Sequence, residues 1–194
     1  MMKSIAVFCG SGLSKDDAHN EEAYRLGEVF AKQSITLVYG GAKIGLMGKV
    51  ADGVLENEGE AIGVIPDFLT TKEVVHTQLS ELIITETMHE RKLKMHDLSD
   101  GIIALPGGFG TLEELFEMLT WAQLGLHKKP IGLLNTNGFY NHLLSFIETM
   151  IDSGLLKPEY RKLVLISDSI DDLLEQMEHF EPMPVPRWMN KNQT

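Results

Sequence analysis

Residues 101–119 decide the fold, and they read Gly-Ile-Ile-Ala-Leu-Pro-Gly-Gly-Phe-Gly-Thr-Leu-Glu-Glu-Leu-Phe-Glu-Met-Leu. The apolar run from Gly101 to Leu105 is too short for a helix and stops at Pro-Gly-Gly, so it predicts a buried strand. Apolar residues then recur at helical spacing, which predicts a helix with Thr111 as its candidate N-cap. A strand, a glycine turn and a helix start together present backbone N–H groups at the positive end of a helix dipole. The stretch therefore predicts a site for a phosphorylated ligand.

Strands rich in Ile, Val and Leu alternate with helical patterns along almost the whole chain. This alternation predicts an α/β fold in which a parallel sheet is covered by helices on both faces. The predicted strands are Ser4–Cys9, Thr36–Tyr39, Ala61–Ile65, Leu82–Thr85, Gly101–Leu105, Ile131–Leu134 and Leu163–Ile166. The predicted helices are Asn20–Gln33, Leu46–Asn57, Met88–Leu98, Thr111–Leu124, Phe139–Ser153 and Ile170–His179. Because the carboxyl ends of parallel strands form the usual binding crevice, we expect the chemistry in the loops that follow the strands.

Length and composition predict one domain. The 194 residues, 43% of them hydrophobic, can bury a substantial core, and no Pro/Ser/Gly-rich linker divides them. We expect a single nucleotide-binding domain over residues 1–180. Pro182, Pro184 and Pro186 predict an extended tail over residues 181–194.

The net charge of -11 bears on the class of partner. It would repel a phosphate backbone, so we expect no general nucleic-acid binding, although local dipoles can still hold a small nucleotide. Cys9, the single cysteine, lies in an apolar strand and is a candidate buried side chain rather than half of a disulfide. The first apolar run is too short for a signal peptide and no run is long enough to cross a bilayer, so we expect a cytoplasmic protein.

Two further glycine-rich loops follow predicted strands. Gly10-Ser11-Gly12 lets the backbone approach a ligand and offers the Ser11 hydroxyl, although an ordinary strand-to-helix turn explains it equally well. The segment Tyr39–Gly48 predicts tight packing or a second ligand-facing wall. It lacks the Gly-Lys-Ser/Thr of a Walker loop and fits a dinucleotide fingerprint poorly, which disfavours a hydride-transfer enzyme.

Arg91 interrupts an apolar helix face. If a helix begins at Met88, then Met88, Arg91 and Met95 share one side of it. A cation near a helix start is unfavourably placed in the helix dipole, so a carboxylate or a ligand phosphate should compensate for it. The equal alternative is an arginine whose stem packs while its guanidinium stays in water.

Two acidic residues each allow two interpretations. Thr111 and Glu114 fit a capping box, which would contribute about 1 kcal/mol, while a carboxylate on the first helical turn can also face the crevice. Glu73 lies in the polar segment 66–80, where a solvated loop acid is the commoner case and a crevice residue the alternative. The histidines show no metal-ligand spacing, so we expect no metal.

Several of these segments together resemble one family. Residues Pro106–Glu114 match the PGGxGTxxE motif of the LOG (LONELY GUY) family, the cytokinin riboside 5′-monophosphate phosphoribohydrolases. The other matching segments are Cys9–Ser11, Tyr39–Gly41, Gly45–Gly48, Met88–Lys92 and Trp121–Pro130. Gly12 stands where a second serine is common, and Ala42 where a third glycine is common. We expect these departures to alter ligand fit in the two loops, and they leave the central motif intact.

The resemblance implies a Rossmann-like doubly wound sheet, a homodimer or larger homo-oligomer, and hydrolysis of the N-glycosidic bond of purine nucleoside 5′-monophosphates. It implies Arg91 and Glu114 as the catalytic pair. The residues that it places around the substrate are Ser11, Glu73, Met88, Lys92, Gly107, Gly108, Phe109, Gly110, Thr111 and Thr120. No metal or organic cofactor is needed. Relatives once carried the label lysine decarboxylase, but no lysine of this chain stands in a recognisable pyridoxal-phosphate context.

Breaking the glycosidic bond builds positive charge on the ribose and negative charge on the leaving base. We expect Glu114 to stabilise the ribose cation or to orient the attacking water. Arg91 binds the phosphate, holds Glu114 ionised or assists the leaving base, and the sequence does not choose among these roles. The competing functions are a nucleotide-binding module without catalysis and a pure scaffold, which would have little use for the glycine turns.

Overall fold

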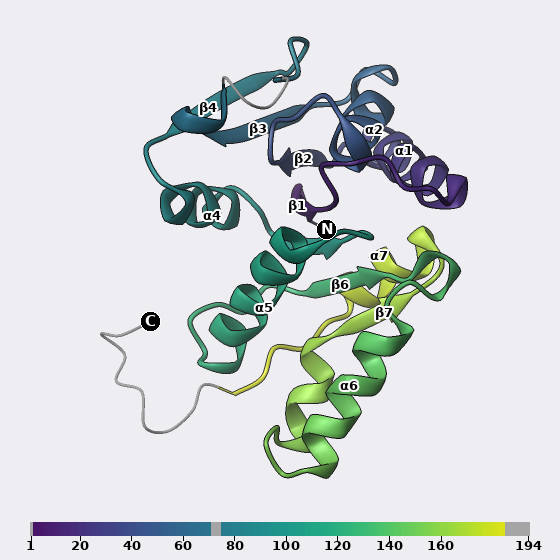
Figure 1. The fold of residues 1–194 in the computed structure, drawn as a ribbon, viewed down its shortest axis with the longest axis vertical. Helices are drawn as coiled ribbons and strands as arrows, with labels where there is room; N and C mark the ends of the chain where they lie inside the picture. The colour runs from purple at the N-terminus through teal and green to yellow at the C-terminus, as the bar shows by residue number, and fades with distance from the viewer. Residues whose placement is uncertain (1, 71–74, 185–194) are drawn as a thin grey trace.

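The described strands form one parallel sheet in the order β4-β3-β2-β1-β5-β6-β7 (Figure 1). The computed structural model describes residues 2–70 and 75–184. Its strands are β1 (Ser4–Phe8), β2 (Thr36–Tyr39), β3 (Ala61–Pro66), β4 (Glu81–Thr85), β5 (Gly101–Ala104), β6 (Ile131–Leu134) and β7 (Leu165–Ser167). The predicted strands and the Rossmann-like parallel sheet are confirmed. The predicted last strand moves by two residues at its start because Leu163 ends a 3-10 helix.

The helices agree with the predicted set apart from their ends. They are α1 (Asp17–Lys32), α2 (Gly45–Leu55), α3 (Asp67–Thr70), α4 (Met88–Asp97), α5 (Phe109–Gln123), α6 (Asn141–Asp152) and α7 (Ile170–Glu178), with 3-10 helices η1 (Thr136–Gly138) and η2 (Pro158–Leu163). The short helix α3 was not expected, because four residues carry too little periodicity to be seen in a sequence. Among the described residues, no helix is both long and apolar enough to cross a membrane.

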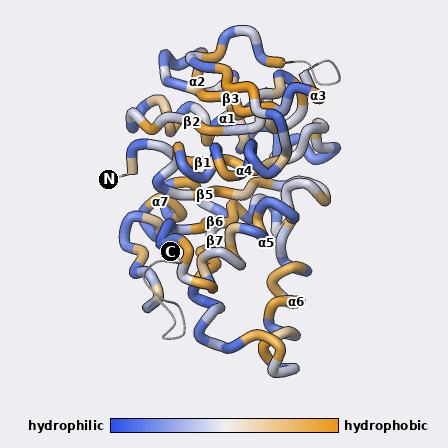
Figure 2. Tube along the Cα trace, turned by 90° about the vertical axis from the view of Figure 1, so that its left-hand side faces the viewer, coloured by the Kyte–Doolittle hydropathy of each residue, from blue (hydrophilic) through white to orange (hydrophobic). Residues whose placement is uncertain are grey.

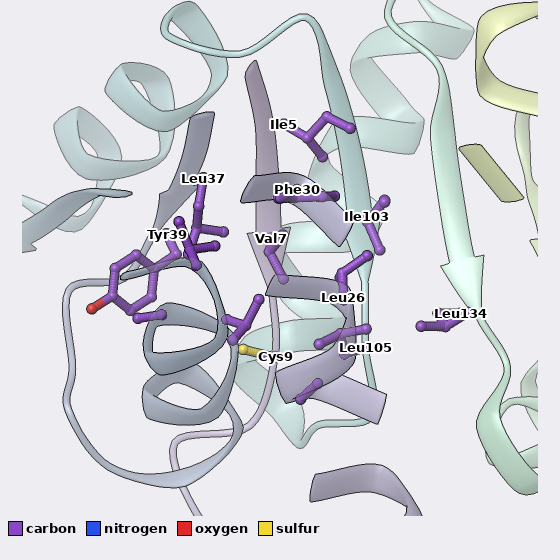
Figure 3. Packing of buried hydrophobic residues seen from close by; sticks show 14 of the residues in the cluster. Ile5, Val7, Cys9, Leu26, Phe30, Leu37, Tyr39, Ile103, Leu105 and Leu134 are labelled. Carbon is purple, nitrogen blue, oxygen red and sulfur yellow. The ribbon is translucent and has the colours of Figure 1, made fainter. Parts of the chain in front are cut away.

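Side chains on either face of the sheet make two separate apolar layers, because alternate residues of a strand point to opposite sides. Ile5 and Val7 of β1 pack with α1, α2 and α7, and Figure 3 shows them beside Leu26 and Phe30 of α1. The next residues, such as Phe8, pack on the other face with α4, α5 and α6. Figure 2 shows the strands stacked edge to edge, with α5 and α6 on one side and α7 on the other.

Helices α1 and α2 cross at two glycines. A Cβ atom on Gly27 would lie 2.3 Å from the carbonyl oxygen of Val50. A Cβ atom on Gly53 would lie 2.1 Å from the carbonyl oxygen of Tyr24. The two helix backbones are therefore in contact, and any larger residue at either position would push them apart.

The strand order reverses between β1 and β5. From β1 the chain builds β2, β3 and β4 outward on one side, and then returns to place β5 against the other side of β1. The loop after β1 leads to α1 on one face, and the loop after β5 leads to α5 on the opposite face. Loops that diverge in this way open a crevice at the carboxyl ends of the two strands.

Candidate active site

A cavity of about 310 Å³ lies at this crevice. The loops after β1, β2 and β5 contribute to it, and α4 closes one side. The residues that line it are Val7, Phe8, Cys9, Gly10, Ser11, Gly40, Met47, Leu69, Met88, Arg91, Met95, Gly108, Phe109, Gly110, Thr111 and Glu114. The predicted crevice and most of the predicted site residues therefore coincide.

The glycine turn after β5 leads directly into helix α5. The backbone N–H of Gly10 donates to the Pro106 carbonyl at 3.1 Å, which ties this turn to the loop after β1. Gly107 is part of this turn, and a Cβ atom there would come within 2.1 Å of the Thr111 Oγ1 atom. The backbone N–H groups of the first helical turn have no carbonyl partner within α5, so they can bind an anion in the cavity.

The prediction that Thr111 caps α5 is wrong. The N-cap is Gly108, and the helix begins at Phe109, two residues earlier than expected. Thr111 is instead buried in the first turn, where it lines the cavity. Glu114 consequently lies one turn further along α5 and cannot close a capping box with Thr111. The interpretation of Glu114 as a member of a capping box is therefore wrong, and Glu114 lines the cavity.

Arg91 and Glu114 meet inside the cavity. The Nη1 atom of Arg91 lies 3.7 Å from the Oε1 atom of Glu114, and the two residues are only 7% and 8% exposed. The Nε atom of Arg91 donates to the carbonyl oxygen of Val64, at 3.0 Å, which fixes the plane of the guanidinium. The sequence predicted that a carboxylate or a ligand phosphate would compensate for this cation, and the structure places the Glu114 carboxylate beside it. The alternative of a guanidinium in water is wrong, because Arg91 is buried.

Gly40 makes room for the guanidinium. A Cβ atom at this position would lie 2.2 Å from the Arg91 Nη2 atom and 2.8 Å from the Met47 Sδ atom. The sequence indicated that the loop holding Gly40 forms a ligand-facing wall or a tight packing contact. The structure confirms the tight packing contact, which Gly40 makes with Arg91, and Gly40 also lines the cavity.

Burial governs the electrostatics of Glu114. Removal from water raises the pKa of this carboxyl from 4.5 to about 7, although the positive charge of Arg91 opposes the shift. The carboxylates of Glu113 and Glu117 raise the pKa further, and the ammonium of Lys92 lowers it. A carboxyl that titrates near neutral pH can act as a general base or acid.

Helix α4 begins as predicted, at Met88. Thr87 is its N-cap, and the Thr87 hydroxyl oxygen accepts a hydrogen bond from the backbone N–H of Glu90 at 3.1 Å. Met88 and Met95 line the cavity on the same side of α4 as Arg91, as the helical spacing predicted. The cap therefore aligns the helix face that presents the guanidinium.

Of the predicted site residues that the structure describes, Gly107, Lys92 and Thr120 are not among the residues that line this cavity. Lys92 is buried, but its Nζ atom contacts the carboxylates of Glu113 and Glu117 outside the described lining of the cavity. Thr120 is exposed, donates its hydroxyl proton to the Phe116 carbonyl, and lines a separate pocket of about 160 Å³. Glu73 lies outside the described residues.

Sequence reasoning missed several lining residues. Leu69 carries no recognisable chemical pattern, and only the fold brings it to the cavity. The same holds for the Val64 carbonyl, which does not line the cavity but accepts the hydrogen bond from Arg91. Cys9 is buried, as the sequence predicted. Burial raises the pKa of its thiol well above the usual range, which disfavours the thiolate form. Within residues 2–70 and 75–184, no three His, Cys, Asp or Glu side chains are grouped as metal ligands would be.

Comparisons with known proteins bear on the family of this chain. A family model described as "Possible lysine decarboxylase" matches residues 47–177. Cytokinin riboside 5′-monophosphate phosphoribohydrolase LOG7 of Arabidopsis thaliana is 44% identical over 180 residues, covering 93% of this chain and 83% of the relative. The corresponding LOG5 protein of the same plant is 44% identical over 181 residues, covering 93% of this chain and 79% of the relative.

A solved structure supports the fold independently. The molybdenum cofactor binding protein from the phototrophic bacterium Rippkaea orientalis matches with a TM-score of 0.68 and 24% identity. The match covers 92% of this chain and 96% of that one. At this level of identity, the likeness extends to the fold alone.

Proposed function

This chain belongs to the LOG family, and from that premise we propose that it hydrolyses nucleoside 5′-monophosphates whose base is adenine or an N6-modified adenine. The products are the free base and ribose 5-phosphate. The observation that carries the proposal is the buried pair of Arg91 and Glu114, which shares one cavity with the first turn of α5. The curated relatives are named for the same reaction on cytokinin riboside 5′-monophosphates.

The phosphate binds at the start of α5. The free N–H groups of the glycine turn and the helix dipole favour an anion there, and the Ser11 and Thr111 hydroxyls line the same cavity. This interaction holds a part of the substrate that does not react. Its binding energy therefore serves to align the ribose with Glu114.

Glu114 acts on the ribose. As the bond between C1′ and the base nitrogen breaks, its electron pair leaves with the base and C1′ becomes cationic. The ionised carboxylate stabilises that charge and orients a water molecule, whose oxygen bonds to C1′ as one of its protons passes to Glu114. The departing base takes up one proton from solvent, and Glu114 later returns its proton to solvent, so one water is consumed in all. The positive charge of Arg91 favours the ionised form of Glu114, and burial opposes it. The Nε atom of Arg91 is bound to the Val64 carbonyl, so the remaining N–H groups of the guanidinium are the ones available to the substrate.

The assembly that we propose is a homodimer or a larger homo-oligomer. The position of Thr120 supports it, because this predicted substrate residue is exposed and lies apart from the Arg91 cavity of its own chain. Light scattering coupled to size-exclusion chromatography measures the assembly directly, and a monomer at micromolar concentration would contradict the proposal.

The test of the reaction is product analysis by chromatography. The purified protein is incubated separately with AMP, with N6-isopentenyl-AMP and with adenosine, and free base and ribose 5-phosphate are measured. We expect base from one or both nucleotides, little from adenosine, which lacks the phosphate, and none from an Arg91→Ala variant. Binding of both nucleotides without base release would instead favour a nucleotide-binding module.

A further inference from the structure

A second charged cluster joins helices α4 and α5 beside the catalytic pair. The Nζ atom of Lys92 lies 2.5 Å from the Oε1 atom of Glu113 and 2.8 Å from the Oε2 atom of Glu117. The Lys92 side chain is only 5% exposed, whereas those of Glu117 and Glu113 are 20% and 56% exposed. A buried ammonium is strongly unfavourable without partners, so this lysine depends on both carboxylates.

The two clusters use neighbouring residues of the same two helices. Arg91 and Lys92 are consecutive on α4, and Glu113 and Glu114 are consecutive on α5. Consecutive helical residues point about 100° apart. Arg91 and Glu114 can therefore face the cavity while Lys92 and Glu113 join the two helices outside it. Both clusters join α4 to α5, so a change that moves Lys92 away from Glu113 and Glu117 is expected to move Arg91 relative to Glu114 as well.

Charge links the two clusters as well. The groups that face Glu114 are Arg91 and Lys92 from α4, Glu113 and Glu117 from α5, and the Cys9 thiol at the end of β1. With the acids ionised, the charged side chains comprise three negative and two positive groups. Loss of Lys92 would leave Glu114 beside two unneutralised carboxylates.

We propose that Lys92 is a positioning residue, which clamps α4 to α5 and neutralises Glu113 and Glu117 so that Glu114 works as a carboxylate. This role rests on the proposed function. It differs from direct contact with the nucleotide, because the ammonium is already bound by two carboxylates and lies outside the described lining of the cavity. The raised pKa of Lys92, which its carboxylate partners produce against the effect of burial, keeps the ammonium charged.

The test compares Lys92→Met with the triple variant Lys92→Met/Glu113→Gln/Glu117→Gln. Methionine keeps an unbranched stem but removes the charge. We expect the rising limb of kcat/KM against pH to move upward by about one pH unit in Lys92→Met, because like charges then oppose ionisation of Glu114. The triple variant removes the unbalanced carboxylates and should return the limb to within a few tenths of a pH unit of wild type.

Direct substrate binding predicts a different pattern. KM would then rise in both variants at every pH, without a displaced limb and without recovery in the triple variant. A Lys92→Met variant that loses only thermal stability, with an unchanged pH profile, would also overturn the proposal. Near-UV circular dichroism of both variants verifies that they are folded before either profile is interpreted.

A second readout separates this proposal from the proposed function. In protein labelled with carbon-13 at the glutamate carboxyls, the Glu114 resonance is identified by its absence from Glu114→Gln. Its titration midpoint should move upward in Lys92→Met and return in the triple variant, whether or not base is released. If the wild type releases no base, the proposed function fails, and this titration still decides the role of Lys92 towards Glu114.

Discussion

The guanidinium of Arg91 and the carboxylate of Glu114 face each other at 3.7 Å in a place that water scarcely reaches. Arg91 is held from behind by the Val64 carbonyl, so its orientation does not depend on Glu114 alone. Glu114 has a pKa of about 7 in spite of the neighbouring cation, because burial outweighs the attraction. The pair therefore combines a fixed positive group with a carboxyl that can change its charge.

Glu114→Gln should lower turnover by roughly 100-fold or more, because an amide cannot stabilise a ribose cation or accept a proton from water. The measurement is single-turnover release of base from AMP or N6-isopentenyl-AMP. The control is Glu148→Gln, an exposed acid of α6 that pairs with Arg161, and it should keep wild-type activity. Activity retained in Glu114→Gln would remove this residue from the mechanism.

Glu114 should also make stability depend on pH. Its pKa is about 7 in the folded protein against 4.5 ordinarily, so the unfolded chain loses this proton first as pH rises. Protonation of Glu114 therefore adds to the free energy of unfolding. This contribution is fully present below pH 4.5 and is lost as pH rises through 7. Relative to wild type, Glu114→Gln should gain on the order of 1–3 kcal/mol between pH 5 and pH 8.

Urea unfolding of both proteins at the two pH values measures this difference. The comparison uses the change with pH rather than the absolute stability, so any fixed effect of the amide cancels. A difference between the two proteins that stays constant from pH 5 to pH 8 would show that Glu114 is ionised throughout this range.

Gly40→Ala should impair activity more than stability. The added methyl group would overlap the Arg91 Nη2 atom, and the flexible guanidinium can move away more easily than the backbone. We expect a loss of at least 10-fold in kcat/KM, since small displacements in a catalytic pair are costly. Gly27→Ala is the matched control, because its added methyl group overlaps the Val50 carbonyl of α2 and Gly27 does not line the cavity. Equal values of kcat/KM for the two variants would show that the close packing of Gly40 against Arg91 does not matter for activity.

Gly27→Ala should have the opposite effect, on stability first. Its Cβ would overlap the backbone of α2, at 2.3 Å from the Val50 carbonyl oxygen, so α1 and α2 must separate. Overpacking of this kind costs about 2 kcal/mol or more. Thermal unfolding measures this loss of stability, with Gly12→Ala as the control, because no described atom outside its immediate neighbours lies within 4 Å of its added Cβ. An unchanged melting temperature of Gly27→Ala would mean that the helices can shift without cost.

The fold could be predicted because period-two and helical patterns are local properties of the chain. Arg91 could be predicted for a similar reason, since a cation on an apolar helix face near its start requires compensation. The position of the α5 cap could not, because Gly108 replaces Thr111 through the shape of the turn rather than through side-chain chemistry. Nor could the sequence show that Lys92 turns to Glu113 and Glu117, because that depends on how two helices pack.

The pairing of β1 with β5 has a consequence for the order in which the molecule folds. Ile5 pairs with Gly101, so a contact at the centre of the sheet must wait for a loop that spans the first half of the chain to close. Such non-local parallel pairing is slow compared with the formation of contacts that are closer in sequence, such as those within and between α1 and α2. A refolding chain will therefore regain helical signal before it regains affinity for a nucleotide.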